Sequence, residues 1–122
     1  MKTLQSMFMA AALVAATLAS PLAAAHASLK SSVPQAGAIL PAAPKEVTMT
    51  FNEKIEQAFS SATLSDGAGK AIATGKAKVD ETDPTILHLA LPALASGDYT
   101  VSWAVAGQDG HRRKGSFTFS VK

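Results

Sequence analysis

The stretch YTVSWAV, residues 99–105, alternates large apolar side chains with small or polar ones. A period of two places all the apolar side chains on one face of a β-strand, so this stretch predicts a strand with one buried face. The same alternation recurs over residues 47–51, 87–91 and 117–121. Four such segments without a helical period indicate an all-β domain.

Weaker strand patterns at residues 27–33, 61–64 and 71–79 bring the expected number of strands to about seven. Turn sequences separate the strands, at residues 65–69, 83–84 and 96–98. Seven short antiparallel strands in roughly 100 residues predict an immunoglobulin-like Greek-key β-sandwich. Tyr99 directly follows a glycine turn, which resembles the tyrosine corner of such sandwiches. We expect helical structure only as a turn or two within residues 52–58.

The first 25 residues have the organisation of a secretory leader: Lys2, an apolar run from Met7 to Leu18, and small residues up to Ala25. The run spans 12 residues, whereas a membrane-spanning helix needs about 20. Two A-x-A sequences compete as the processing site, one with cleavage before His26 and one with cleavage before Ser28. The first is favoured because it lies nearer the apolar run. We therefore expect a cleaved signal peptide at residues 1–25 and one exported domain at residues 26–122.

Composition excludes several classes of protein. The leader carries only one of the 11 Lys and Arg residues, so residues 26–122 have a formal net charge of +1 against 9 Asp and Glu. No basic stripe with interleaved aromatic residues indicates nucleic-acid binding. The chain contains no cysteine, so disulfides cannot stabilise it and thiolates cannot bind a metal. It also lacks a G-x-S-x-G nucleophile motif, and we expect it not to be an enzyme.

Three histidines remain after cleavage: His26, His88 and His111. Asp109 and His111 are two residues apart, and in extended backbone this spacing puts both side chains on the same side. Alone, a D-x-H triplet is more often part of a solvated loop. With His26 at a free N-terminus, however, the set becomes an amine, two imidazoles and a carboxylate, which suits Cu(II) in tetragonal geometry. The sandwich must bring together residues that are 85 positions apart.

Other candidate residues have ordinary structural interpretations. His88 lies mid-strand on the face opposite the leucines, so we interpret it as an outward-facing histidine. Met49, the only methionine beyond the leader, shares a face with apolar residues and is expected in the core. Glu53 and Glu56 fit a solvated face. Residues 112–114, Arg-Arg-Lys, are expected to form a solvated basic turn, the alternative being a docking site for a partner.

The stretches WAVAGQDGH, residues 103–111, and GSFTFSV, residues 115–121, resemble the CopC family of periplasmic copper-resistance proteins. LKSSVPQAG, residues 29–37, and the Phe-Asn-Glu at residues 51–53 fit the same family. The resemblance implies a cupredoxin-like or immunoglobulin-like β-sandwich that binds one Cu(II) through the amine and imidazole of His26, the carboxylate of Asp109 and the imidazole of His111. It also implies periplasmic copper storage, resistance or delivery, commonly beside an inner-membrane partner of the CopD type.

One departure from the family pattern limits these expectations. Some members carry a Met-rich Cu(I) site in the central loop region, but residues 59–78 of this chain contain neither Met nor His. The resemblance therefore predicts binding of Cu(II) only. Two alternatives remain. One is a copper-dependent polysaccharide monooxygenase, which also presents an N-terminal histidine on a β-sandwich. The other is a metal-free structural sandwich, which would follow from cleavage before Ser28.

Overall fold

A computed structural model describes residues 27–122. The expected signal peptide and His26 lie outside the described residues. The described part contains nine strands and a short 3-10 helix at Gln57–Phe59. The strands are β1 (Leu29–Val33), β2 (Ala38–Leu40), β3 (Glu46–Phe51), β4 (Ser61–Asp66), β5 (Ala71–Ile72), β6 (Lys78–Val79), β7 (Ile86–Ala90), β8 (Gly97–Ala106) and β9 (Arg112–Val121).

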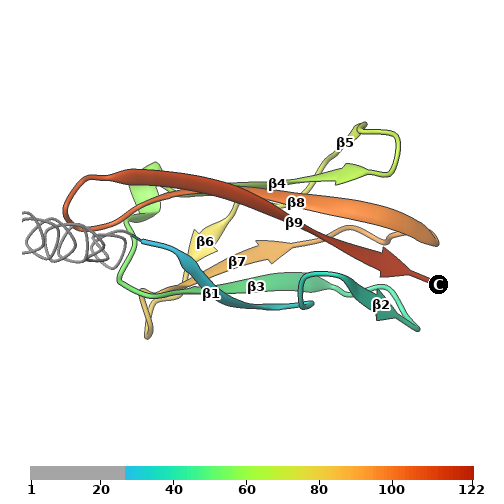
Figure 1. Cartoon of the computed structure of the whole chain (residues 1–122), viewed down its shortest axis with the longest axis horizontal. Coiled ribbons are helices and arrows are strands. Elements are labelled where there is room, and N and C mark those ends of the chain that lie inside the picture. Colours follow the sequence, from blue (N-terminus) through green and yellow to red (C-terminus); the bar gives the residue numbers. More distant parts are fainter. Residues whose placement is uncertain (1–26) are drawn as a thin grey trace, which may run out of the picture.

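Two sheets pack face to face and form the two layers visible in Figure 1. The four-stranded sheet has the order β1-β3-β7-β6, and the five-stranded sheet has the order β2-β9-β8-β4-β5. All strand pairs are antiparallel except β2 and β9, which run parallel. The predicted β-sandwich is confirmed. Among residues 27–122, no helix is long and apolar enough to cross a membrane.

The core lies between the two sheets and is formed by the alternating apolar residues. In β8, Tyr99, Val101, Trp103 and Val105 are all buried, while the residues between them are exposed or half-buried up to Ala104. Met49 is completely buried, which confirms its predicted place in the core. Each strand therefore contributes one apolar face, and burial of that face is the main favourable term that holds a domain without disulfides together.

Tyr99 forms the predicted tyrosine corner. Its hydroxyl donates a hydrogen bond of 2.6 Å to the carbonyl oxygen of Ala95, four residues earlier. Its ring stacks on Phe119 with 5.5 Å between the ring centroids. The corner thus fixes the connection that precedes β8 to the longest antiparallel pair of the fold, β8 and β9.

Trp103 lies across Gly115, its partner on β9. A Cβ atom at Gly115 would lie 2.5 Å from Cζ2 of the indole, so no other residue fits there without displacing the ring. On its other side the indole meets Phe51 edge-on, with 5.1 Å between the centroids. The glycine therefore makes room for the largest side chain of the core.

Several elements differ from the sequence-based expectations. The single strand expected at residues 71–79 is wrong: β5 and β6 are separate two-residue strands in different sheets. Strand β2 was not predicted. Residues 112–114 belong to β9 and not to a turn, because β9 pairs with β8 as far back as Arg112. The helical turn expected within residues 52–58 is a 3-10 helix that begins later, at Gln57.

Candidate metal centre

The turn between β8 and β9 carries two of the predicted ligands. The turn is closed by two backbone hydrogen bonds, from the Gly110 N–H to the Gly107 carbonyl at 3.0 Å and from the Gly107 N–H to the His111 carbonyl at 3.3 Å. Gly110 has a φ of +83°, which favours glycine. Asp109 and His111 flank this residue, so the backbone geometry of the turn sets how they approach each other.

Asp109 and His111 are in direct contact. The carboxylate accepts the His111 backbone N–H at Oδ1, 3.1 Å away, and faces Nδ1 of the ring at Oδ2, 2.9 Å away. The sequence predicted the two side chains on the same side of an extended segment. The structure brings them together through a tight turn instead. Both side chains remain open to solvent, with 40% of the Asp109 side chain and 64% of the His111 side chain exposed.

The start of the described chain is fastened beside the segment that follows β3. The Ser28 N–H donates to the side-chain oxygen of Asn52 at 2.7 Å, and the Asn52 N–H donates to the Ser28 carbonyl at 3.0 Å. Ala27 is 1% exposed. The chain is therefore held in place up to the residue that follows His26, which itself lies outside the described residues.

Glu53 lies beside the same turn. A Cβ atom built on Gly107 would overlap Oε1 of Glu53 and lie 3.2 Å from Oδ1 of Asp109. Gly107 thus leaves the space in which two carboxylates approach one point. The interpretation of Glu53 as part of a solvated face missed this placement. The available signal in the sequence was only its position two residues after the strand that ends at Phe51, which places it at one end of the sandwich.

Two contacts hold the Glu53 segment against the turn. Ile55 forms an isolated β-bridge with Gly107, and the Glu56 N–H donates to the Ala106 carbonyl at 2.9 Å. Figure 1 shows the start of β1, the segment after β3 and the β8–β9 turn at the same end of the sandwich. Within residues 27–122, no three His, Cys, Asp or Glu side chains are grouped so as to hold a metal ion by themselves. The described part of the site is therefore the Asp109–His111 pair with Glu53 alongside.

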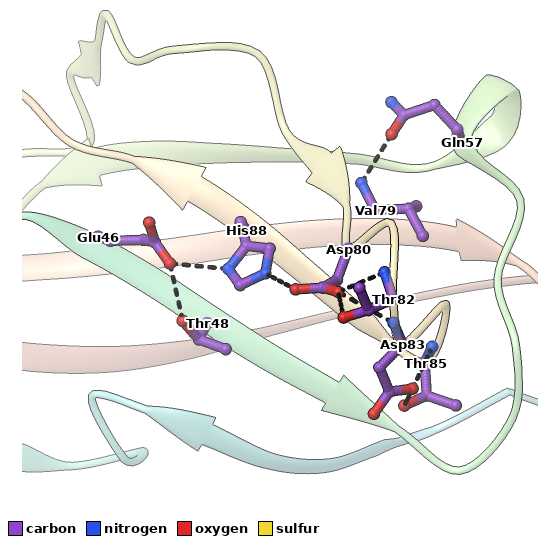
Figure 2. A network of polar contacts seen from close by, with 9 residues as sticks. All are labelled: Glu46, Thr48, Gln57, Val79, Asp80, Thr82, Asp83, Thr85 and His88. Atoms are coloured by element: carbon purple, nitrogen blue, oxygen red, sulfur yellow. Dashed lines mark hydrogen bonds and ion pairs between the residues drawn. The ribbon is translucent and has the colours of Figure 1, made fainter.

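His88 lies in the four-stranded sheet, on the outer face of β7. It does not contact the Asp109–His111 pair, which belongs to the turn between β8 and β9 of the five-stranded sheet. Figure 2 shows its ring between two carboxylates: Nδ1 is 2.7 Å from Oε1 of Glu46, and Nε2 is 2.8 Å from Oδ2 of Asp80. The Asp80 carboxylate is the main reason that the pKa of His88 is raised above 6.5, and Glu46 adds to the rise against an opposing effect of burial. Both ring nitrogens are engaged, so His88 serves to connect strands.

Comparisons with known proteins agree with this architecture. The family model described as the CopC domain matches residues 29–122. The chain belongs to the CopC family. It is 40% identical over 121 residues to Protein YobA of Escherichia coli K12, with 98% of both chains covered.

Two solved CopC-family structures share the fold. CopC from Methylosinus trichosporium OB3b has a TM-score of 0.75 and 36% identity, covering 80% of this chain and 94% of that one. PcoC from Escherichia coli, described as a methionine-rich copper resistance protein, has a TM-score of 0.72 and 32% identity, covering 80% of this chain and 99% of that one. Nearly all of the described residues therefore form one CopC domain.

Proposed function

We propose that this protein binds one Cu(II) ion in the periplasm, through the α-amine and imidazole of His26, the carboxylate of Asp109 and the imidazole of His111. The observation that carries the proposal is the contact between Asp109 and His111. The start of the described chain is held at the same end of the sandwich by the hydrogen bond between Ser28 and Asn52. Membership of a family that includes copper resistance proteins supports copper as the ion.

The position of Ser28 supports the N-terminal part of this ligand set. Two residues of extended chain span at most about 7 Å, so His26 follows closely wherever Ser28 is held. Ser28 is bonded to Asn52, and the next residue, Glu53, packs on Gly107 beside Asp109. The position of Ser28 therefore supports the amine of His26 as a ligand together with the Asp109–His111 pair, provided that the leader is cleaved before His26.

The proposed ligands suit Cu(II) chemically. An amine and the near ring nitrogen of one histidine close a six-membered chelate ring. Cu(II) favours nitrogen and oxygen ligands in tetragonal geometry and lies at the top of the divalent affinity order. Because His111 directs Nδ1 toward Asp109, its ring would take the metal through Nε2, with the carboxylate fixing the orientation of the ring. Glu53 adds a further negative charge beside the cation.

Protons compete with copper for this site. The amine and both imidazoles must be deprotonated to bind the ion, and an unperturbed α-amine titrates at about 7.7–8.0. Copper affinity therefore decreases as the pH falls below this range. Since residues 59–78 contain neither Met nor His, the proposal assigns no thioether site and no Cu(I) to that region.

The proposed role is copper binding in storage, resistance or delivery, without catalysis and with an inner-membrane transporter of the CopD type as partner. The described site fits cargo binding, because Asp109 and His111 lie in a short hydrogen-bonded turn that loses little conformational entropy when a ligand is bound. It offers no serine or cysteine nucleophile paired with a base.

The test begins with the mature protein purified from the periplasm. Intact mass should show His26 as the first residue, and titration should show one equivalent of Cu(II) by electron paramagnetic resonance. A variant with one extra residue before His26 should lose as much affinity as His26→Ala, because both remove the chelate. His88→Ala is the matched control and should bind copper normally.

Three results would contradict the proposal. They are a mature chain that begins at Ser28, an extended variant that binds Cu(II) as tightly as the native protein, and ascorbate-driven release of oxidised oligosaccharides by the copper-loaded protein. The last would identify a polysaccharide monooxygenase instead.

A further inference from the structure

Half of strand β9 has an open edge. Strand β8 pairs with β9 along its whole length, from Arg112 to Val121, but β2 pairs with only the last three residues, Phe119–Val121. Figure 1 shows β2 beside the C-terminal end of β9 alone. Among residues 27–122, no strand therefore covers the side of residues 112–117 that faces away from β8. The backbone N–H and C=O groups on such an edge can pair with another chain.

A groove runs along this open edge. It has a volume of about 640 Å³ and lies between the start of β9 and the start of β1. Strand β1 is itself the outermost strand of the four-stranded sheet. The residues that line the groove are Ala27, Ser28, Leu29, Trp103, Arg112, Arg113, Lys114, Gly115 and Ser116. None of these residues is acidic.

Three consecutive cations lie on the open edge. Arg112, Arg113 and Lys114 are all exposed, and in the part of the chain that the structure describes none of them forms an ion pair with a carboxylate. The Arg112 guanidinium lies 5.3 Å from the centre of the Phe59 ring, a cation–π contact that orients it. Positive charge is therefore held at the edge, and no carboxylate among the described residues neutralises it.

The strand periodicity distributes these charges over both faces. Arg112 and Lys114 follow the outward series of β9, and Arg113 follows the inward series that continues to Phe117. A strand added along the edge would present its own side chains alternately to the two faces. Consecutive acidic residues in that strand would each meet a cation.

We propose that an extended acidic segment of a partner protein docks along residues 112–116 by adding a strand to the five-stranded sheet. Backbone hydrogen bonds supply affinity in this mode of recognition, and the paired charges supply specificity. Arg112 directly follows His111, so the docked segment lies beside the proposed copper ligands. Only this last statement depends on the proposed function. The docking itself does not require copper.

Two competing roles of the basic edge lead to different experimental results. Cations on an exposed edge can serve only to prevent edge-to-edge association between copies of a protein. Alternatively, a basic surface can bind anionic lipids. A groove along a strand edge favours an extended peptide over a flat bilayer surface.

The experiment uses the copper-free mature protein labelled with ¹⁵N. Its probe is an acetylated and amidated hexapeptide with four consecutive glutamates. Amide signals should shift at residues 27–29 and 112–116, and affinity should weaken as salt is added. The triple variant Arg112→Gln, Arg113→Gln, Lys114→Gln should bind at least 10-fold more weakly. The control variant Lys45→Gln, Lys70→Gln, Lys76→Gln removes the same charge elsewhere and should bind within twofold of the native protein.

A second probe isolates the strand pairing. The same peptide with N-methyl groups on alternate backbone nitrogens keeps all four glutamates and its charge but loses those N–H donors, as proline would, so it should bind much more weakly. Several results would overturn the proposal: equal affinity for the two peptides, an equal loss in both triple variants, or binding to vesicles of anionic lipid with no binding of the peptide. Self-association of the edge variant with peptide binding unchanged would show that the cations only protect the edge.

Discussion

The carboxylate of Asp109 bonds both the backbone and the ring of His111, at 3.1 Å to the N–H and 2.9 Å to Nδ1. A single side chain thus closes the turn and orients the imidazole. Orientation and charge are partly separable functions of Asp109, because asparagine lacks the negative charge but retains one oxygen that can accept one of these two hydrogen bonds.

Asp109→Asn should therefore weaken Cu(II) binding by at least about 10-fold and Asp109→Ala by at least about 100-fold, because loss of the proposed carboxylate ligand adds to the effect found for partners that orient a metal-bound histidine. Competition titration against a chelator of known affinity measures both losses. Equal losses in the two variants would mean that the proposed ligation by the carboxylate, with its charge, accounts for the whole effect and that the orientation of His111 contributes little.

Glu53 should contribute through its charge. Its carboxylate borders the same point above Gly107 as Asp109, so Glu53→Gln is expected to weaken Cu(II) binding by roughly 3- to 10-fold through reduced attraction. Glu56→Gln removes an equal charge from an exposed side chain in the same segment and is the matched control. Equal losses in the two variants would show that proximity to Gly107 is irrelevant.

The His88 bridge makes stability depend on pH. Asp80 raises the pKa of His88 above 6.5, so the folded protein holds this proton more tightly than the unfolded chain. The resulting stabilisation is complete below about pH 6.5 and is lost as the pH rises through the folded-state pKa. His88 in turn holds the pKa of Asp80 well below its usual value of 3.8, so the carboxylate's contribution is lost only in strong acid.

His88→Gln should therefore lower Tm most between about pH 4 and pH 6.5, by about 3–6 °C, and much less at pH 9. Thermal unfolding followed by circular dichroism across this range provides the measurement. Lys70, an exposed residue between β4 and β5 in the other sheet, supplies the control, because Lys70→Gln should change Tm by the same amount at each pH. A pH-independent effect of His88→Gln would show that the ring acts by packing alone.

Gly115→Ala should destabilise the fold by about 1–3 kcal/mol, the usual effect of overpacking. The new methyl group would displace the Trp103 indole, because Cζ2 of the ring lies only 2.5 Å from the ideal position of that methyl group. Urea unfolding gives the free energy, and near-ultraviolet circular dichroism of the single tryptophan reports the ring. Gly67→Ala, whose Cβ would make only ordinary contacts at 3.6 Å, should change stability by much less.

Strand patterns predicted the centre of the sandwich and failed at its margins. The alternation in β3, β7, β8 and β9 is long enough to identify a buried face, and the tyrosine corner follows from the residues before Tyr99. Strands β2 and β5 have three and two residues, too few for any periodicity. Arg112 is part of β9 because the adjacent strand β8 continues to Ala106, its pairing partner. The sequence of residues 112–114 alone does not reveal this pairing.

The candidate site was predicted in its residues but not in its geometry. Spacing placed Asp109 and His111 together through extended backbone, whereas a turn with a left-handed Gly110 does so in the structure. Glu53 could not be assigned from spacing, since its approach to Gly107 arises from packing between segments more than 50 residues apart. The role of His26 remains a prediction, because it lies outside the described residues.

The two ends of the sandwich differ in their suitability for attaching a fusion partner or a surface. Strand β9 carries the chain from the Asp109–His111 turn to a C-terminus at the far end of the molecule (Figure 1). A surface, a fluorescent protein or a membrane anchor joined after Lys122 would leave the opposite end facing outward. A tag placed ahead of His26 would instead block the amine of the proposed chelate.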